Sequence, residues 1–356
     1  MNPNEQRLEY PLGDTLAQPG DPLALADGVY WIRMPLPFVL DHINLWLLRD
    51  RIDGRDGWTI VDCGVARPEV KALWDRIFEE KLQGLPVLRV IVTHMHPDHV
   101  GLAGWICERW KSPLWMSMTD YFVARHWAQP DSGDHSGGGP NGEAAVVHFS
   151  RHGMQDPESL EQIRQRAGYY TSLVEPLPGS FRRLIHGDRI TIGGREWRVI
   201  VGYGHAPEHV SLYCDDLGVL ISGDMVLPRI STNVSVFHFE PEANPLPLYL
   251  DSLDRYADLP EDTLILPSHG KPFRGLHERI RQQHEHHAER LAEVVEACAE
   301  PLSAADVVPV LFHRKLDLHQ LTFAMGEALA HLHALYFEGR LTRSMGADGI
   351  YRFTAA

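Results

Sequence analysis

The stretch Thr93-His94-Met95-His96-Pro97-Asp98-His99 places three imidazoles and one carboxylate close together. It directly follows Val87-Leu88-Arg89-Val90-Ile91-Val92, a β-branched apolar run that is typical of a short buried strand. Loops at the ends of such strands commonly carry functional side chains. Because neither packing nor solvation explains so many metal-binding groups in one loop, the stretch predicts a metal site at the end of this strand.

The spacing within the loop indicates two ions rather than one. In an extended chain His94 and His96 project to the same side and can reach one ion, whereas Asp98 and His99 can reach a second. Further ligand candidates each follow a short apolar strand and stand close to glycine: His205, Asp224 and His269. We therefore expect two divalent metal ions that share one carboxylate. Zinc is the first choice, with iron or manganese as alternatives, since all three accept imidazole and carboxylate ligands.

Short apolar segments on both sides of the loop predict an α/β fold with two groups of strands. The first group comprises residues 28–34, 42–49, 57–64, 87–92 and 113–117, and the second comprises residues 181–185, 189–201, 210–214, 218–223 and 263–267. Turn residues predict hairpins at Asp53–Gly57 and at Gly193-Gly194. A predicted helix at residues 68–82 separates two strands of the first group, which implies sheets covered by helices.

These motifs resemble the metallo-β-lactamase superfamily, nearest to its glyoxalase II-like hydrolases. The family signature H-x-H-x-D-H corresponds to His94, His96, Asp98 and His99, and the later family ligands correspond to His205, Asp224 and His269. Asp62 in Val61-Asp-Cys-Gly64 matches the structural aspartate of the family. The resemblance covers residues 28–275 and implies an αββα sandwich of two mixed sheets with the site at one edge.

The resemblance also implies a role for each ligand. His94, His96 and His205 would hold the first ion, Asp98, His99 and His269 would hold the second, and Asp224 would bridge them. A hydroxide that bridges the two cations would be the nucleophile. Asp98 would orient this hydroxide and Asp224 would fix the separation of the metals, which makes these two carboxylates the predicted catalytic residues.

Three reactions are compatible with such a site. The leading hypothesis is hydrolysis of a small-molecule ester, thioester or lactone. A phosphodiesterase or ribonuclease could use the same two ions and is the alternative. A mononuclear iron persulfide dioxygenase is the third possibility, and it is disfavoured because both ion sites look complete.

The remaining segments predict additional domains. Residues 1–27 are expected to form a tail, and residues 118–178 an insertion over the site, with a mobile loop from Asp131 to Gly142. Residues 276–356 predict a helical linker followed by helix, helix and hairpin, the order of a small α+β winged-helix-like domain. We expect this domain to be a cap or a homodimer contact rather than a nucleic-acid reader.

The composition favours a small-molecule substrate. The formal charge of −15, from 48 acidic and 33 basic residues, disfavours nucleic acid as a partner. The four cysteines are widely separated and predict free thiols in a reducing compartment. No run of apolar residues is long enough to indicate a membrane partner, and a cytoplasmic enzyme fits best.

Several residues near the ligands are of secondary interest. The family pattern G-H-T-P-G-H stands here as Gly204-His-Ala-Pro-Glu208-His209, so we expect Glu208 to reshape the rim and His209 to support a ligand. Candidates for substrate contact, chosen only because they adjoin ligand segments, are Tyr203, Arg229, Asn233 and Lys271. The histidines from His284 to His287 predict a solvated helix face.

Overall fold

The structure is a computed structural model that describes residues 4–128 and 140–356. The chain forms two compact units. Unit 1 comprises residues 1–130, 170–232 and 253–280, and unit 2 comprises residues 131–169, 233–252 and 281–356. The predicted loop from Asp131 to Gly142 lies mostly outside the described residues, and its last positions begin a helix instead. The predicted domain boundaries stay predictions.

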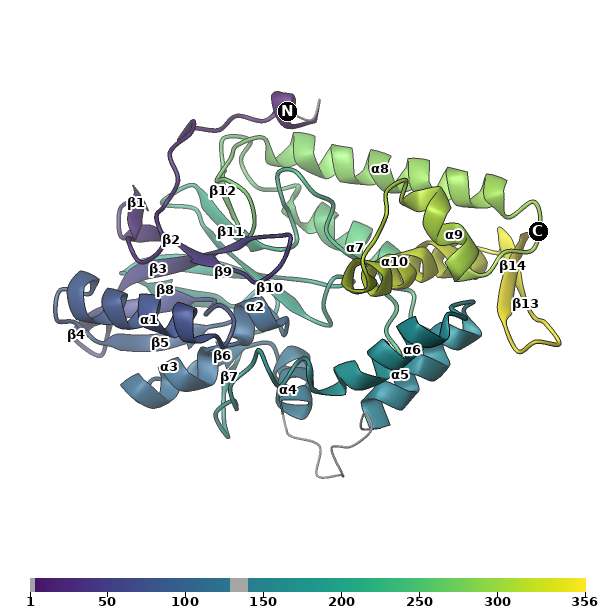
Figure 1. The fold of residues 1–356 in the computed structure, drawn as a ribbon. Coiled ribbons are helices and arrows are strands. Elements are labelled where there is room, and N and C mark those ends of the chain that lie inside the picture. The colour runs from purple at the N-terminus through teal and green to yellow at the C-terminus, as the bar shows by residue number, and fades with distance from the viewer. Residues whose placement is uncertain (1–3, 129–139) are drawn as a thin grey trace. The chain divides into compact units, whose positions relative to one another are not determined.

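Unit 1 contains a seven-stranded mixed sheet (Figure 1). Its strands are adjacent in chain order: β1 (Leu23–Ala26), β2 (Val29–Pro35), β3 (His42–Ile52), β4 (Arg55–Val61), β5 (Val87–Ile91), β6 (Leu114–Met116) and β7 (Arg182–Arg183). Pairs from β1 to β4 are antiparallel and pairs from β4 to β7 are parallel. Asp53 and Gly54 make the turn between β3 and β4 with φ of 51° and 80°, so the predicted hairpin is present, but Arg55 to Gly57 belong to β4 and not to the connection. β1 lies in the segment that we expected to be a tail.

A five-stranded mixed sheet forms the other half of the sandwich. Its spatial order is β12 (Leu264–Pro267), β11 (Val219–Gly223), β10 (His209–Cys214), β9 (Arg195–Gly202) and β8 (Arg189–Ile192). Only β11 and β12 pair parallel. Gly193 and Gly194 connect β8 and β9 with φ of 61° and 77°, which confirms the second predicted hairpin.

The two sheets pack face to face around one apolar core. Trp31 and Trp46 of the first sheet and Trp197 of the second are almost fully buried in it. The outer face of the first sheet is covered by α1 (Pro68–Arg76), which continues as the π-helical turn η2 (Ile77–Lys81), and by α3 (Ala103–Trp110) (Figure 1). On the second sheet, the 3-10 turn η4 (Asp254–Tyr256) places the Tyr256 hydroxyl 2.8 Å from Ser211 of β10. The predicted αββα sandwich of two mixed sheets is confirmed.

A buried ion pair ties the two sheets together. Arg89 of β5 donates to the Asp50 carboxylate of β3 at 2.6 and 3.1 Å. The other Asp50 oxygen accepts the Gly193 N–H at 2.9 Å, and Arg89 donates to the Thr191 carbonyl at 2.5 Å. Because each buried charge faces an opposite charge and backbone groups of the second sheet, the pair holds the sheets in one relative position.

Unit 2 is mainly helical. Its elements are α5 (Pro140–Arg151), α6 (Pro157–Gln165), the 3-10 turn η3 (Arg166–Gly168), most of α7 (Pro245–Leu253), most of α8 (Leu276–Ala297), α9 (Ala304–Leu311), α10 (Leu318–Phe337), β13 (Leu341–Met345) and β14 (Tyr351–Ala355). Capping boxes begin α9 at Ser303 and α10 at Asp317. A small C-terminal helical and β domain is therefore present, while its likeness to a winged helix stays a prediction.

Two expectations for the helices need correction. α5 was not predicted, and the amphipathic helix that the sequence predicts from Pro157 to about Val174 is shorter in the structure, where α6 ends at Gln165. His287 of α8 is fully buried, so the prediction that this histidine belongs to a solvated face is wrong. Among the described helices, none combines the length and the apolar character that a membrane-spanning segment needs.

Candidate metal centre

The predicted ligands follow the ends of strands from both sheets. His94 and His96 lie just after β5, and α2 (Pro97–Val100) carries Asp98 and His99 in its first turn. In the other sheet, His205 follows β9, Asp224 follows β11 and His269 follows β12. All of them belong to unit 1. Because these ends meet at one edge of the sandwich, side chains distant in sequence come together there.

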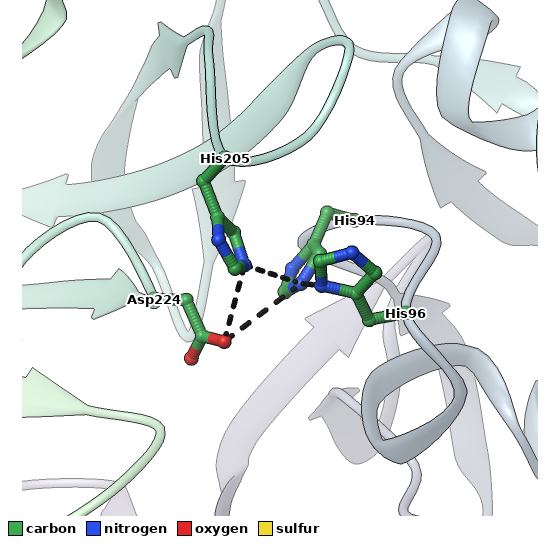
Figure 2. A group of neighbouring side chains, drawn as sticks. All are labelled: His94, His96, His205 and Asp224. Atoms are coloured by element: carbon green, nitrogen blue, oxygen red, sulfur yellow. Dashed lines mark hydrogen bonds and ion pairs between the residues drawn. The ribbon is translucent and has the colours of Figure 1, made fainter. Parts of the chain in front are cut away.

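The first group comprises His94, His96, His205 and Asp224 (Figure 2). The Nε2 atom of His94 lies 2.8 Å from Nδ1 of His96 and 3.2 Å from Nε2 of His205. An Asp224 carboxylate oxygen lies 3.2 Å from His205 Nε2 and 3.9 Å from His94 Nε2. One ligand atom from each residue lies within 4.8 Å of the others, which suits a single cation.

The second group comprises Asp98, His99 and His269. Asp98 Oδ2 lies 3.4 Å from His269 Nε2 and 3.7 Å from His99 Nε2. Asp224 reaches this group too, because its Oδ2 lies 3.5 Å from His99 Nε2 and its Oδ1 lies 3.6 Å from His269 Nε2. The two groups therefore meet at Asp224 and are consistent with a dinuclear metal site.

Two atoms at the junction of the groups show that the residues there fit a cation. His99 Nε2 and Asp224 Oδ1 are buried and have no hydrogen-bond partner. Buried polar atoms without partners are costly and uncommon. An imidazole nitrogen and a carboxylate oxygen are both ligands for a divalent ion, so the residues present fit the two metals that the sequence implies.

The pKa values of the site divide its residues into two kinds. Burial and the neighbouring imidazoles lower the pKa of His94 well below its usual value, and burial lowers the pKa of His96 to about 3. Both are therefore neutral, the form that binds metal. Burial opposes ionisation of Asp98, but the imidazoles of His99 and His269 outweigh it and lower the pKa of Asp98 to about 2. At neutral pH this residue is a carboxylate ready to bind a cation.

Two anchors orient the ligands of the second group. Asp62, which has a left-handed φ of 62°, accepts bonds from Thr93 N and Thr93 Oγ1 at 2.8 Å each and lies 2.8 Å from His99 Nδ1. His269 Nδ1 lies 2.8 Å from the carbonyl oxygen of His42. With Nδ1 held in this way, each ring presents Nε2 to the site.

His209 supports Asp224 rather than joining a ligand group. Its Nε2 accepts the Asp224 N–H at 3.0 Å, and its ring centroid lies 4.8 Å from that of His94. Gly223 has a φ of 56°, and a Cβ there would lie 2.3 Å from His209 Nε2. Glycine is therefore required before Asp224, both for the backbone conformation and for the closeness of the imidazole.

Glu208 contacts a helix of the predicted insertion. Its carboxylate accepts the Thr119 N–H at 3.1 Å at the start of α4 (Met118–Trp127). The next residue of α4, Asp120, makes a second contact with Glu208: it is fully buried and accepts the Glu208 N–H at 2.7 Å. The sequence did not identify Asp120 as a residue of the site. The only signal for Asp120 was the Ser117-x-x-Asp120 pattern, which indicates no more than a helix start.

Three of the four substrate-contact candidates, Tyr203, Arg229 and Lys271, lie in unit 1 close to ligand segments. Tyr203 packs against the apolar core, and the Arg255 guanidinium lies 4.8 Å from its ring centroid. Arg229 has a 73% exposed side chain with a Glu5 carboxylate 3.8 Å away. Their role in substrate binding stays a prediction.

Lys271 and Asn233 have polar partners of their own. Lys271 donates to the Gly13 carbonyl at 2.8 Å and to Asp14 at 3.0 Å. Asn233 belongs to unit 2, where it donates to Glu327 at 3.1 Å. Both assignments to substrate stay predictions as well.

The chain is similar to solved and curated proteins over 70% of its length or more. It is 55% identical to a beta-lactamase domain protein from Burkholderia ambifaria, with a TM-score of 0.93 and complete coverage of both chains. It is 25% identical over 333 residues to the probable metallo-hydrolase YqjP of Bacillus subtilis, which covers 91% of this chain and 97% of the relative. It is also 25% identical over 260 residues to the human acyl-coenzyme A thioesterase MBLAC2, covering 70% of this chain and 81% of that protein.

Two family models match the chain. Residues 291–356 match the model described as "Metallo-beta-lactamase-like, C-terminal domain", which shows that the C-terminal part of unit 2 has counterparts in related proteins. Residues 39–269 match the model described as "Metallo-beta-lactamase superfamily". This second match spans more than half of the chain and contains both ligand groups, so the chain belongs to the metallo-β-lactamase superfamily.

Proposed function

We propose that the chain is a metal-dependent hydrolase that cleaves the thioester of a small molecule, with esters and lactones as weaker substrates. The observation that carries the proposal is the meeting of the two ligand groups at Asp224. The family and the metallo-hydrolase YqjP support hydrolysis in general. The thioester is favoured by the relative whose name states acyl-coenzyme A thioesterase activity.

The ligand groups define what this chain contributes to such a reaction. Two divalent cations, when bound, would supply Lewis acidity and a water of lowered pKa as nucleophile. The residues that would hold them are His94, His96 and His205 on one side, Asp98, His99 and His269 on the other, and Asp224 between. No further nucleophilic side chain is needed.

The two carboxylates have different positions and therefore different tasks. The Asp98 side chain is 17% exposed, and its accessible edge can accept a hydrogen bond from the attacking water and orient it. The Asp224 side chain is 9% exposed and lies between imidazoles of both groups, so it sets their separation. Imidazoles in both groups leave the centre less negative than a carboxylate cluster, which favours approach of a polarised carbonyl.

The test compares metal-stripped protein with protein reloaded with zinc on acyl-coenzyme A, aryl ester, lactone and phosphodiester substrates. We expect thioester turnover to fall at least about 100-fold on stripping and to return with zinc. Asp98→Asn should lower turnover in the loaded protein, while Asp216→Asn, an exposed carboxylate in the turn before β11, should leave it unchanged.

Equal rates for stripped and loaded protein would overturn a metal-dependent mechanism. Metal-dependent turnover of the phosphodiester alone would overturn the thioester assignment and favour a phosphodiesterase. Iron-dependent oxygen consumption with a persulfide would do the same in favour of a dioxygenase.

A further inference from the structure

Two side chains outside the ligand groups hold the peptide between the first two ligands. Met95 stands between His94 and His96, and its side chain is fully buried. Its N–H donates to Asp120 Oδ1 at 2.8 Å, and its carbonyl accepts the Tyr170 hydroxyl at 2.5 Å. Both polar groups of this residue are thus fixed by side chains from distant parts of unit 1.

The same aspartate also holds the loop of a third ligand. The second Asp120 oxygen accepts the Glu208 N–H at 2.7 Å, three residues after His205, and the Ser117 hydroxyl at 3.1 Å. In return, the Glu208 carboxylate accepts the Thr119 N–H at 3.1 Å. Asp120 therefore connects two ligand loops that belong to different sheets.

We infer that Asp120 and Tyr170 are positioning residues that set the geometry of the cation site formed by His94, His96 and His205. A carboxylate is suited to this task, because it offers an acceptor to each of two backbone N–H groups from different loops. An asparagine has one acceptor oxygen and would turn an NH₂ group toward the other N–H. Asp120 and Tyr170 together bind the N–H and the carbonyl of Met95, and we call this pair of residues the clamp. The Tyr170 ring lies beside Trp127, with ring centroids 5.4 Å apart.

The hydrogen bonds of Asp120 and Tyr170 go to the loops that carry His94, His96 and His205. His99 is held by Asp62 and His269 by the His42 carbonyl, and neither of these contacts involves Asp120 or Tyr170. Loss of the clamp should therefore weaken one cation selectively. The inference rests on the metal centre of the proposed function but does not depend on which bond the enzyme cleaves.

The test measures two zinc dissociation constants of the full chain by competition with a chromophoric chelator. Asp120→Asn should weaken one zinc ion by about 10–100-fold and change the other less than about 3-fold. Tyr170→Phe should weaken the same ion to a smaller extent. Asp156→Asn is the matched control, because Asp156 likewise accepts a backbone N–H at a helix start, at 2.8 Å from Ser159 N, but contacts neither ligand loop.

A double-mutant comparison identifies the affected site. In a His205→Asn background, which already lacks one ligand of the first group, adding Asp120→Asn should leave the remaining zinc constant unchanged. Hydrogen exchange of metal-free protein gives a readout without any metal, since amides in residues 93–96 and 205–209 should exchange faster in Asp120→Asn than in the parent chain.

Each outcome decides the question. Unchanged zinc constants and unchanged exchange in Asp120→Asn would overturn the clamp, and so would equal weakening of both ions together with a lower melting temperature. If Asp120→Asn does not fold, the inference is overturned when both zinc dissociation constants are unchanged in Tyr170→Phe. A parent chain that binds no zinc would instead contradict the proposed function, while the exchange readout would still test the clamp.

Discussion

Both units bury histidines, but they surround them with different partners. In unit 1, His99 and His269 face the carboxylates of Asp62, Asp98 and Asp224. In unit 2, buried imidazoles face backbone carbonyls or one another: His331 Nδ1 lies 2.8 Å from the Glu327 carbonyl, and His287 Nδ1 lies 3.2 Å from His331 Nε2. Among the described residues, both groups able to hold a metal lie in unit 1. The presence of a carboxylate, and not burial of histidine alone, distinguishes the metal centre.

The pKa of His99, a ligand of the second group, is shifted in the opposite direction from the pKa values of two buried histidines in unit 2. Burial disfavours protonation of His99, but Asp62, Asp224 and Asp98 outweigh it and raise the pKa of His99 well above its usual value. In unit 2 burial lowers the pKa of His148 to about 3, and that of His152 to about 4. A cation must displace a proton at His99, whereas His148 and His152 stay neutral without any ligand.

The largest expected effect is on turnover and metal content, when a histidine is replaced by asparagine once in unit 1 and once in unit 2. His205→Asn should remove a ligand, so turnover should fall by roughly three orders of magnitude and the metal content should drop. His333→Asn should keep both metals and most of the turnover, because an asparagine amide can replace the bond of 2.8 Å between His333 Nδ1 and the Ala243 carbonyl. Elemental analysis together with kcat/KM measures both. Metal loss in His333→Asn would erase the distinction between the units.

The next effect compares two buried carboxylates, Glu327 of unit 2 and Asp50 of unit 1. Burial raises the pKa of Glu327 to about 7, from its usual 4.5, with only a partial offset from Asn233. A raised carboxyl pKa means that stability is lost as the pH rises from 4.5 through 7, by about 3.5 kcal/mol at about 1.4 kcal/mol per pKa unit. Glu327→Gln should therefore stabilise the protein at pH 8 and have little effect below pH 4.5.

Asp50 of unit 1 provides the contrast to Glu327. Because Asp50 pairs with Arg89 at 2.6 Å, Asp50→Asn should destabilise the protein by about 3 kcal/mol or more at pH 8. Urea unfolding of both variants at pH 8, followed by circular dichroism, gives the two changes. If both substitutions changed the free energy of unfolding in the same direction, the contrast between Glu327 and Asp50 would be contradicted.

The smallest expected effect is a change in how steeply the free energy of unfolding varies with pH. Since the pKa of His148 is lowered in the folded chain, the unfolded chain binds the proton first, and stability should fall as the pH drops below the usual histidine value of 6.5. The groups near His148 and His152 are His238, His333, Arg343 and Glu242. His148→Gln should remove about 2 kcal/mol of the loss between pH 6.5 and 5.

Urea titrations of parent and variant at several pH values check this slope. Glu327 titrates with the opposite sign over part of the range, but it is present in both proteins and cancels in the comparison. Parallel stability curves for the parent and His148→Gln would mean that His148 is accessible to protons in the folded state.

The sequence was sufficient for the features that depend on local pattern. The turns at Asp53-Gly54 and Gly193-Gly194, the strands before each ligand and the ligand motifs all follow from short stretches of chain. Family resemblance then supplied the fold that brings His94 near His205, a pairing that no local pattern contains.

Other features could not be predicted because they arise only in the folded chain. Asp120 and Tyr170 are far apart in sequence, and their common contact, the Met95 peptide, carries no side-chain signal. The burial of His287 depends on its packing in unit 2, beside Tyr249 and His331. A polar helical segment with neighbouring Glu285 and His286 gives no indication of that burial.

The separation of the ligands along the chain has a consequence for biosynthesis. His94 and His205 are 111 residues apart, and His269 lies beyond both. A nascent chain that has left the ribosome only as far as β7 has four of the ligands but none from the second sheet. The centre can therefore be completed only late in synthesis, and a chain truncated before residue 269 would bind metal weakly and transiently. Metal loading of the complete site is thus tied to the emergence of nearly the whole of unit 1.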